Sequence, residues 1–254
     1  MTWDPALYLR FADQRLRPAL DLLARVDLGA PERVIDLGCG AGNVTAFLKR
    51  RWPDAGVVGI DNSQEMLAQA RASAPGIRWE TGDLSTWQPA DPVTLLYSNA
   101  ALHWADRHEH LFPRLARFVA PGGVLAIQMP HQYNAPSHHS GLELARSVRW
   151  RDKLQGIARA SPVADPQQYY DWLAPHVAQL DIWETEYLQC MEGENPVADF
   201  TKATFLRQFL DLLDGAERSA FEAEYRELVL RAYPKRDDGR TLFPFRRLFI
   251  VARI

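Results

Sequence analysis

The residues with the clearest chemical potential are three glycines at the end of a short apolar segment. Residues 34–43 read Val-Ile-Asp-Leu-Gly-Cys-Gly-Ala-Gly-Asn, so that Gly38, Gly40 and Gly42 alternate with small residues directly after a β-branched run. Glycine has no Cβ, which lets the backbone turn tightly and approach a ligand closely. Asn43 stands where a dinucleotide fingerprint needs its third glycine, so the loop indicates a ligand other than a dinucleotide.

Three carboxylates accompany this loop at the ends of successive predicted strands. Asp36 precedes the first glycine by two residues, where it would repel a pyrophosphate but suits a cationic or amine-bearing ligand. Asp61 follows Gly38 by 23 residues, the usual place for an acid that accepts both ribose hydroxyls. Asp83 ends a third strand and is placed to accept a hydrogen bond from an adenine amine. A single acid at a strand end is most often a cap or turn former, but three of them beside this loop favour ligand binding.

Alternating strand-like and helix-like segments must position these residues. Strands are expected at 33–37, 56–60, 77–81, 93–98 and 124–129, and helices at 43–52, 64–73 and 109–119. Ser63 is expected to cap the second of these helices, and Pro121-Gly122-Gly123 to turn tightly into the last strand. This alternation predicts an α/β, doubly wound Rossmann-like sheet, mostly parallel and covered by helices on both faces.

The second half of the chain is expected to add helical insertions and an antiparallel C-terminal strand to one domain spanning 1–254. Helices are predicted at 141–154, 165–174 and 196–233, and strands at 182–191 and 242–254, whereas Ser137-His138-His139-Ser140 is expected to be a polar loop. The predicted layout has an N-terminal lid helix at 1–25, a core at 30–130, 176–192 and 242–254, and helical caps at 131–175 and 193–240. Insertions after the carboxyl ends of strands would lie over the ligand crevice.

Composition excludes several classes of partner. The 254 residues are 47% apolar and 24% charged with a net charge of −3, and no long Lys/Arg run is present, so nucleic acid and anionic membranes are not expected to bind. No apolar stretch approaches the ~20 residues of a membrane helix, and the charged N-terminus does not resemble a signal peptide. Cys39 and Cys190 are too few for a disulfide framework, and the histidines lack carboxylates at ligand spacing, so no metal is expected. We expect a cytoplasmic protein.

The loop, Asp61, the Gly82-Asp83 pair and the Pro-Gly-Gly turn together resemble the class I S-adenosylmethionine-dependent methyltransferases. The resemblance implies S-adenosylmethionine as cofactor and S-adenosylhomocysteine as product. It implies that the glycine loop approaches the methionine moiety, that the second-strand acid holds the ribose and that the third-strand Asp contacts adenine. The residues that we assign to the cofactor on this basis are Asp36, Gly38, Gly40, Gly42, Asp61, Asn62, Met66, Asp83, Leu84, Ser98 and Asn99.

A narrower resemblance runs almost from end to end. The segments 3–11, 98–104, 128–130, 238–242 and 244–252 are similar to those of trans-aconitate 2-methyltransferases. This resemblance implies methyl transfer to a carboxylate of trans-aconitate, a small-molecule acceptor, with a monomethyl ester as product. Such an acceptor is already ionised near pH 7, so no general base is expected.

A tricarboxylate acceptor needs cationic side chains to hold its spare carboxylates. Arg207, Arg246 and Arg247 are the candidate clamps, and because the last two alternate on a predicted strand only one of them can face the acceptor. The residues that we assign to acceptor binding are Tyr8, His103, Trp104, His131, Thr204, Arg207 and Arg246. An exposed helical arginine is an equally good interpretation of Arg207.

Two departures from the family pattern leave the identity of the methyl acceptor undecided. Phe205 and Gln208 depart from the pattern of the family, which has a proline at the position of Gln208. If this segment covers the acceptor pocket, the acceptor differs from trans-aconitate in size or shape. The alternatives are another small carboxylate, such as a malonyl thioester or a different tricarboxylic acid, a nicotinamide oxidoreductase, which Asn43 and Asp36 disfavour, and a cofactor-binding protein without turnover. The oligomeric state stays open.

Overall fold

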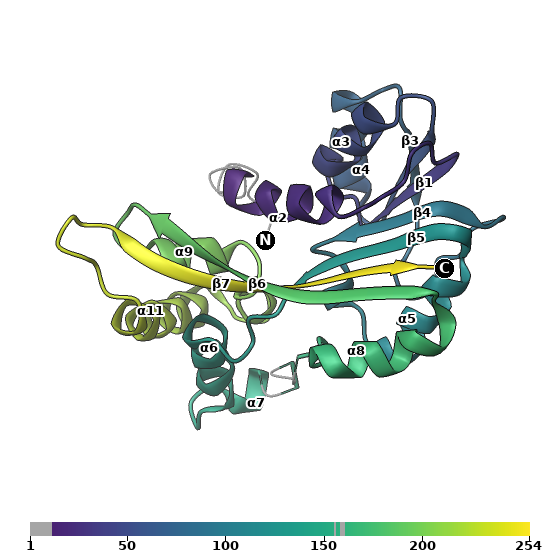
Figure 1. Cartoon of the computed structure of the whole chain (residues 1–254). Helices are drawn as coiled ribbons and strands as arrows, with labels where there is room; N and C mark the ends of the chain where they lie inside the picture. Colours follow the sequence, from purple (N-terminus) through teal and green to yellow (C-terminus); the bar gives the residue numbers. More distant parts are fainter. Residues whose placement is uncertain (1–11, 155, 158–160) are drawn as a thin grey trace. The chain divides into compact units, whose positions relative to one another are not determined.

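The computed structural model describes residues 12–154, 156–157 and 161–254, with side chains from residue 16 onward (Figure 1). The helix α2 (Ala12–Ala24) covers the described part of the N-terminal helix expected at 1–25. Tyr8 and the segment 3–11 lie outside the described residues. Across the described residues, no helix combines the length and apolar character needed to cross a bilayer.

A seven-stranded sheet with the order β3-β2-β1-β4-β5-β7-β6 organises the chain. Its strands are β1 (Arg33–Leu37), β2 (Gly56–Asp61), β3 (Arg78–Thr81), β4 (Val93–Asn99), β5 (Val119–Pro130), β6 (Gln179–Met191) and β7 (Thr241–Arg253). The first five strands pair in parallel, and β7 pairs antiparallel with β5. The predicted doubly wound, mostly parallel sheet with an antiparallel C-terminal strand is therefore confirmed. The strand order reverses between β1 and β4, the point at which such sheets bind ligands.

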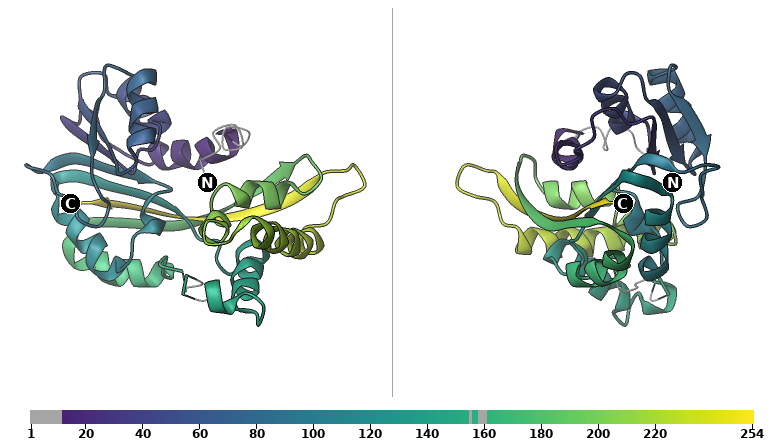
Figure 2. Two further views of the ribbon diagram at one scale, coloured as in Figure 1. Left: turned by 180° about the vertical axis from the view of Figure 1, so that it is seen from behind. Right: turned by 45° about the vertical axis from the view of Figure 1, so that its right-hand side comes forward.

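One compact unit contains most of the sheet and comprises Leu16–Pro130, Pro162–Thr185 and Arg247–Ile254. Two helices, α3 (Asn43–Arg51) and α4 (Gln64–Ser73), cover one of its faces, and α5 (His108–Arg117) and α8 (Pro166–Leu173) cover the other (Figures 1 and 2). The helix α2 lies on the face of α3, where the buried Tyr97 hydroxyl donates to the carbonyl oxygen of Ala19 at 2.6 Å. As expected, Ser63 caps α4 and accepts from the N–H of Met66 at 3.3 Å.

The other compact unit contains, among the described side chains, His131–Ser161 and Glu186–Arg246. Its helices are α6 (Pro136–Arg146), α7 (Arg151–Leu154), α9 (Pro196–Lys202), α10 (Arg207–Leu210) and α11 (Gly215–Ala232). They enclose an aromatic core that includes Phe205, Phe209, Phe221, Tyr225 and Phe243. The helix expected at 196–233 is divided into α9, α10 and α11, and Asp214 caps the last of these, accepting from the N–H of Glu217 at 3.0 Å.

The structure corrects the polar loop expected at 137–140. This segment forms the first turn of α6, and Pro136 at the start of the helix holds the backbone in a helical conformation. His138 is only 7% exposed, and its ring stands 4.4 Å from that of Phe205 between centroids. A polar sequence was buried here because an aromatic side chain distant in the sequence covers it.

Two further elements differ from the expectation. The Pro121-Gly122-Gly123 turn lies within β5, which starts at Val119 and shifts its register against β4; Gly122 has a φ of 78° and donates its N–H to the carbonyl oxygen of Ile254. The helix α8, assigned by sequence to the first cap, groups with the sheet, because Tyr169 packs against Phe112 of α5 with centroids 4.6 Å apart.

Candidate active site at the carboxyl edge of the sheet

The glycine loop after β1 adopts a backbone that side chains would obstruct. Gly38, Gly40 and Gly42 have φ values of 82°, 54° and 82°, in the left-handed region that favours glycine. A Cβ on Gly38 would lie 2.2 Å from the Cβ of Ala101, and one on Gly42 would lie 2.4 Å from the Trp79 ring. A Cβ on Gly40 would meet nothing within 4 Å. The loop is therefore packed at both ends and open at its centre, where a ligand has room to contact the backbone.

Asp61 holds the open part of the loop in place. Its Oδ2 accepts the N–H of Gly40 at 2.8 Å, and its Oδ1 accepts the N–H of Ser63 at 2.9 Å. Each carboxylate oxygen has a second lone pair, and Asp61 is only half-buried, so both oxygens can accept a further hydrogen bond from a ligand. The end of β2 and the loop after β1 thus form one surface.

Asp36 lies inside the unit and not on its open edge. Its side chain is 1% exposed, and Oδ2 accepts the hydroxyl proton of Thr45 on α3 at 2.6 Å. Burial raises the pKa of Asp36 to about 7, the hydrogen bond from Thr45 opposes this rise, and the negative charge of Asp61 adds to it. The group expected to touch the ligand therefore sits behind the loop, where its charge depends on pH near neutrality.

Asp83 and Leu84 follow β3 at the same edge. Asp83 is exposed and forms a turn in which its Oδ1 accepts the N–H of Ser85 at 2.8 Å. Leu84 is half-buried and borders the first glycine, since its Cδ2 would lie 3.4 Å from a Cβ on Gly38. Asn62, which follows Asp61 directly, is exposed, and Met66 in the first turn of α4 is half-buried.

Ser98 and Asn99 at the end of β4 have different environments. Ser98 is 1% exposed, and its hydroxyl donates to the carbonyl oxygen of Leu37 at 2.7 Å, which ties β4 to β1. Asn99 is half-buried, and within the described residues its buried Oδ1 accepts no hydrogen bond. Ala100 follows with a φ of 52°, an unusual value for a residue other than glycine. At this strand end Asn99 thus has an oxygen that can accept a further hydrogen bond, whereas the hydroxyl of Ser98 is used to join two strands.

The short helix η1 (Leu102–Trp104) carries His103 and Trp104 at this edge. Their rings lie 4.7 Å apart between centroids, and Trp104 is 56% exposed.

A buried histidine that sequence reasoning missed supports η1. His108 is 1% exposed; its Nε2 donates to the carbonyl oxygen of Leu102 at 2.9 Å, and its Nδ1 accepts from the Tyr169 hydroxyl at 2.6 Å. Tyr169 in turn accepts the N–H of Ala164 at 3.2 Å, which assigns these donor roles. Burial lowers the pKa of His108, so the ring stays neutral. No local signal predicts this arrangement, because it joins α5 to α8 across 61 residues.

The candidate acceptor-binding residues of the second compact unit, the one that comprises His131–Ser161 and Glu186–Arg246, fall into two groups. His131 and Arg246 are neighbours, since the N–H of His131 donates to the carbonyl oxygen of Arg246 at 3.0 Å, and Gln132 Oε1 accepts the N–H of Arg246 at 2.8 Å. Thr204 is half-buried after α9. Arg207 on α10 forms an ion pair with Asp211, with Nε and Oδ2 3.2 Å apart. Arg207 is half-buried on this helix.

The two arginines of β7 differ in burial. Arg246 is exposed, whereas Arg247 is 3% exposed, and its Nη1 lies 3.5 Å from Oε1 of the buried Gln128. The alternation was predicted, and at this point of β7 the side chain of Arg247 is buried whereas that of Arg246 is exposed.

Phe205 belongs to the core of the second unit, and Gln208 is half-buried beside it. Phe205 is 4% exposed and packs over Gly141, where a Cβ would lie 2.6 Å from its ring. Gln208 donates from Nε2 to the carbonyl oxygen of Phe205 at 3.0 Å. The bulk of Phe205 is therefore accommodated by a glycine on α6.

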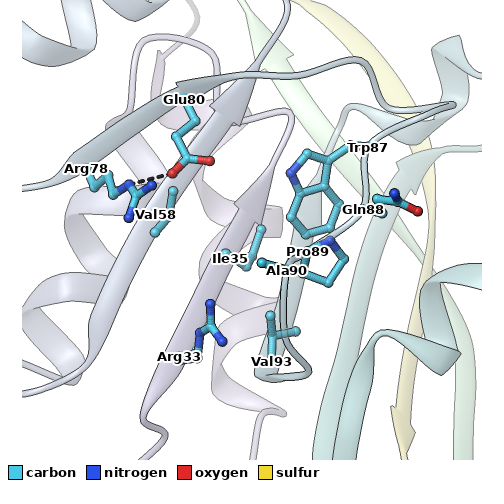
Figure 3. A pocket seen from close by; sticks show the side chains of 10 residues that line it. All are labelled: Arg33, Ile35, Val58, Arg78, Glu80, Trp87, Gln88, Pro89, Ala90 and Val93. Carbon is cyan, nitrogen blue, oxygen red and sulfur yellow. Dashed lines mark ion pairs between the residues drawn. The ribbon is translucent and has the colours of Figure 1, made fainter.

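A surface depression of about 460 Å³ lies at the opposite, amino ends of the strands (Figure 3). It is bordered by Arg33, Arg78 and Val93, the first residues of β1, β3 and β4, and Arg78 forms an ion pair there with Glu80. None of the residues assigned to the cofactor or the acceptor lines it. In the part of the chain that the structure describes, no three His, Cys, Asp or Glu side chains are grouped as metal ligands.

Comparison with known proteins identifies relatives along the whole chain. Residues 34–123 match a family described as a methyltransferase domain. The chain is 47% identical over 251 residues to a trans-aconitate 2-methyltransferase of Azoarcus sp. (strain BH72), covering 99% of this chain and 98% of that protein. It is 45% identical over 252 residues to a trans-aconitate 2-methyltransferase of Methylobacterium nodulans, covering 99% and 98%.

Solved structures share the fold at low identity. The YcgJ protein of Bacillus subtilis aligns with a TM-score of 0.59 at 16% identity, over 94% of this chain and 99% of that chain. A phosphoethanolamine N-methyltransferase 2 of Haemonchus contortus in complex with S-adenosyl-L-methionine aligns with a TM-score of 0.56 at 15% identity, over 93% and 52%. On the full-length identity to its curated relatives, the chain belongs to the trans-aconitate 2-methyltransferase family of S-adenosylmethionine-dependent methyltransferases.

Proposed function

We propose that this protein transfers the methyl group of S-adenosylmethionine to a carboxylate of trans-aconitate, giving the monomethyl ester and S-adenosylhomocysteine. The observation that carries the proposal is identity of 45–47% over almost the full length of relatives that bear this name. Identity at this level extends through both compact units, so it includes the residues outside the methyltransferase domain match at 34–123.

The carboxyl edge of the sheet fits the cofactor. The space at Gly40 allows close approach to the backbone, and Asp61 retains acceptor capacity beside it. We assign the ribose hydroxyls to Asp61, the adenine to Asp83 and Leu84, and the methionine moiety to the loop of Gly38–Gly42. Asp36 contributes from behind the loop, where a negative charge favours a positively charged ligand.

The reaction needs little proton chemistry from the protein. When bound, S-adenosylmethionine supplies a methyl group on positively charged sulfur, and the O–C bond to the acceptor forms as the C–S bond breaks. The acceptor carboxylate is already ionised at neutral pH, so no side chain must remove a proton. The residues of the chain must instead align the carboxylate oxygen with the methyl carbon and exclude water. We assign this to His103 and Trp104 on η1.

A two-step titration tests the proposal. S-adenosylhomocysteine is titrated into the protein by calorimetry, and trans-aconitate is then added to the saturated protein; ester formation with the live cofactor is followed by mass spectrometry. Binding of both and formation of the monomethyl ester support the function. Binding of S-adenosylhomocysteine without trans-aconitate would leave the methyltransferase class and refute the acceptor, and the same assay with other tricarboxylic acids and a malonyl thioester would then identify the substitute.

We place the reaction in the cytoplasm. Both cysteines are free thiols, and Cys190 is exposed, which suits a reducing compartment. Measuring the distribution of the protein between cell fractions tests this assignment.

A further inference from the structure

Three polar side chains continue the candidate site beyond β4. Asn99 pairs in register with Gln128, and Pro130 pairs with Arg247. Residues paired across strands project from the same face of a sheet, and so do residues two apart on one strand. Asn99, Gln128 and Arg247 therefore share one face of the sheet. The strands that carry them, β4, β5 and β7, are neighbours (Figure 1).

This face is the one that carries the rest of the candidate site. Asp36 pairs with Tyr97, which lies two residues before Asn99 on β4. Asp36 contacts α3 through Thr45, and Tyr97 contacts α2 through its hydroxyl. The glycine loop leads from β1 into α3 and so opens toward the same face.

Burial leaves a hydrogen-bond donor of this set unmatched. Gln128 is 0% exposed, and within the described residues its Nε2 has no acceptor, while its Oε1 faces Nη1 of Arg247 at 3.5 Å. A buried amide donor without an acceptor is costly and therefore rare in proteins unless an ordered water or a ligand binds there. Arg247 brings a positive charge to the same place, and a planar guanidinium matches a carboxylate with two parallel hydrogen bonds.

The order of the strands places this pair on the acceptor side of the cofactor. Under the proposed function, the adenosine lies over the ends of β2 and β3, marked by Asp61 and Asp83, and the methionine end lies over β1 and β4. The next strands along the edge are β5 and β7. The acceptor must lie beyond the methyl group, in line with the C–S bond, which is where Gln128 and Arg247 stand.

We propose that Arg247 and Nε2 of Gln128 form a clamp that binds one of the non-reacting carboxylates of the acceptor; the inference rests on the proposed function. The clamp makes the site selective for acceptors with at least two carboxylates. The reacting carboxylate stays outside the clamp, because strong hydrogen bonds to its oxygens would weaken it as a nucleophile.

Near-isosteric substitutions test the clamp. Gln128→Glu keeps the volume and puts a carboxylate beside Arg247, where it would occupy the clamp from within. We expect it to weaken trans-aconitate binding to the S-adenosylhomocysteine complex about 30-fold or more and to leave the dissociation constant of S-adenosylhomocysteine within about twofold. Arg247→Lys keeps the charge but loses the fork, and we expect about 10-fold weaker trans-aconitate binding.

Arg253→Gln is the matched control on the same strand. Arg253 faces the opposite, amino edge, where its Nη1 donates to the carbonyl oxygen of Gly122 at 3.1 Å, so its loss should leave trans-aconitate binding unchanged. Thermal melting of each variant establishes folding, and if Gln128→Glu does not fold, Arg247→Lys decides.

The outcomes separate the clamp from the proposed function. Unchanged trans-aconitate affinity in folded Gln128→Glu or Arg247→Lys protein would overturn the clamp, as would a loss confined to S-adenosylhomocysteine, which would assign the pair to the cofactor. If the wild-type protein binds S-adenosylhomocysteine but not trans-aconitate, the proposed acceptor fails. The same titrations with tricarballylate and malonate then test the clamp. The clamp is supported if the variants bind whichever carboxylate the wild-type protein binds, but more weakly, and it is refuted if their affinity is unchanged.

Discussion

Replacing Asp36 by Asn should make the stability of the protein less dependent on pH. Asp36 is 1% exposed, and burial raises its pKa from 3.8 to about 7. An acid with a raised pKa holds its proton more tightly in the folded state than in the unfolded state. The contribution of Asp36 to the free energy of unfolding is therefore fully present below pH 3.8 and is lost as the pH rises toward 7. Asparagine carries no charge at any pH and can still accept the hydrogen bond from Thr45.

The magnitude follows from the pKa of Asp36. At ~1.4 kcal/mol per pKa unit, the rise of the pKa from 3.8 to about 7 lowers the free energy of unfolding by about 4 kcal/mol above pH 7. At pH 5 about 2 kcal/mol has been lost, so a further 2–3 kcal/mol disappears between pH 5 and pH 8. The free energy of unfolding of Asp36→Asn, relative to the wild type, should therefore rise by roughly 2–3 kcal/mol between these pH values.

Urea denaturation at pH 5 and pH 8 measures this difference, because other titrating groups cancel between the two proteins. Asp91→Asn is the control: Asp91 is exposed and pairs with Arg33 at 2.8 Å, so its replacement should change stability by about 1 kcal/mol or less. An equal stability difference between wild type and Asp36→Asn at both pH values would refute the argument, since it would mean that burial does not raise the pKa of Asp36. Asp36→Asn should also weaken binding of the positively charged S-adenosylmethionine more than that of S-adenosylhomocysteine at pH 8.

Three further predictions concern folding. Gly42→Ala should lower the free energy of unfolding by roughly 2–4 kcal/mol, because a Cβ would lie 2.4 Å from an indole carbon at a φ of 82°, whereas Gly29→Ala, with no atom within 4 Å of its Cβ, should change it little; urea denaturation compares the two. His108→Phe should cost about 2 kcal/mol by removing the partner of the Tyr169 hydroxyl, and a wild-type melting curve from this variant would contradict a structural role for the imidazole. Burial lowers the pKa of His138 from 6.5 to about 3. The contribution of His138 to the free energy of unfolding is therefore fully present above pH 6.5 and is about 2 kcal/mol smaller at pH 5. His138→Phe should remove that part of the pH dependence, which urea denaturation at pH 5 and pH 8 measures.

The fold was largely predictable because its signals are local. Alternating apolar strands and amphipathic helices depend on the period of the backbone, and parallel pairing follows from the helices between the strands. Element ends were less predictable. The first turn of α6 looks polar, yet it is helical because Pro136 starts the helix and Phe205 covers His138. The register shift at the start of β5 depends on pairing with β4 and on a contact to the last residue of the chain.

The candidate site divides in the same way. The glycine loop and Asp61 could be named from spacing, because the carboxyl ends of adjacent parallel strands lie at the same edge of the sheet. Asp36 was named as well, but its burial behind α3, and the pKa of about 7 that this burial causes against the opposing hydrogen bond from Thr45, depend on the packing of the folded chain. His108 carried no signal, since its partner is on another helix.

The sequence by itself determined the class of fold, the glycine loop and the acids at the strand ends, and its motifs indicated the family, because each of these depends on residues close together in the chain. Only the tertiary structure decided which of Arg246 and Arg247 is buried and that Gln128 stands beside the buried one. The reason is that alternation along a strand separates two faces without saying which face other elements cover. That choice depends on neighbours more than a hundred residues away, and on the register in which β5 and β7 pair.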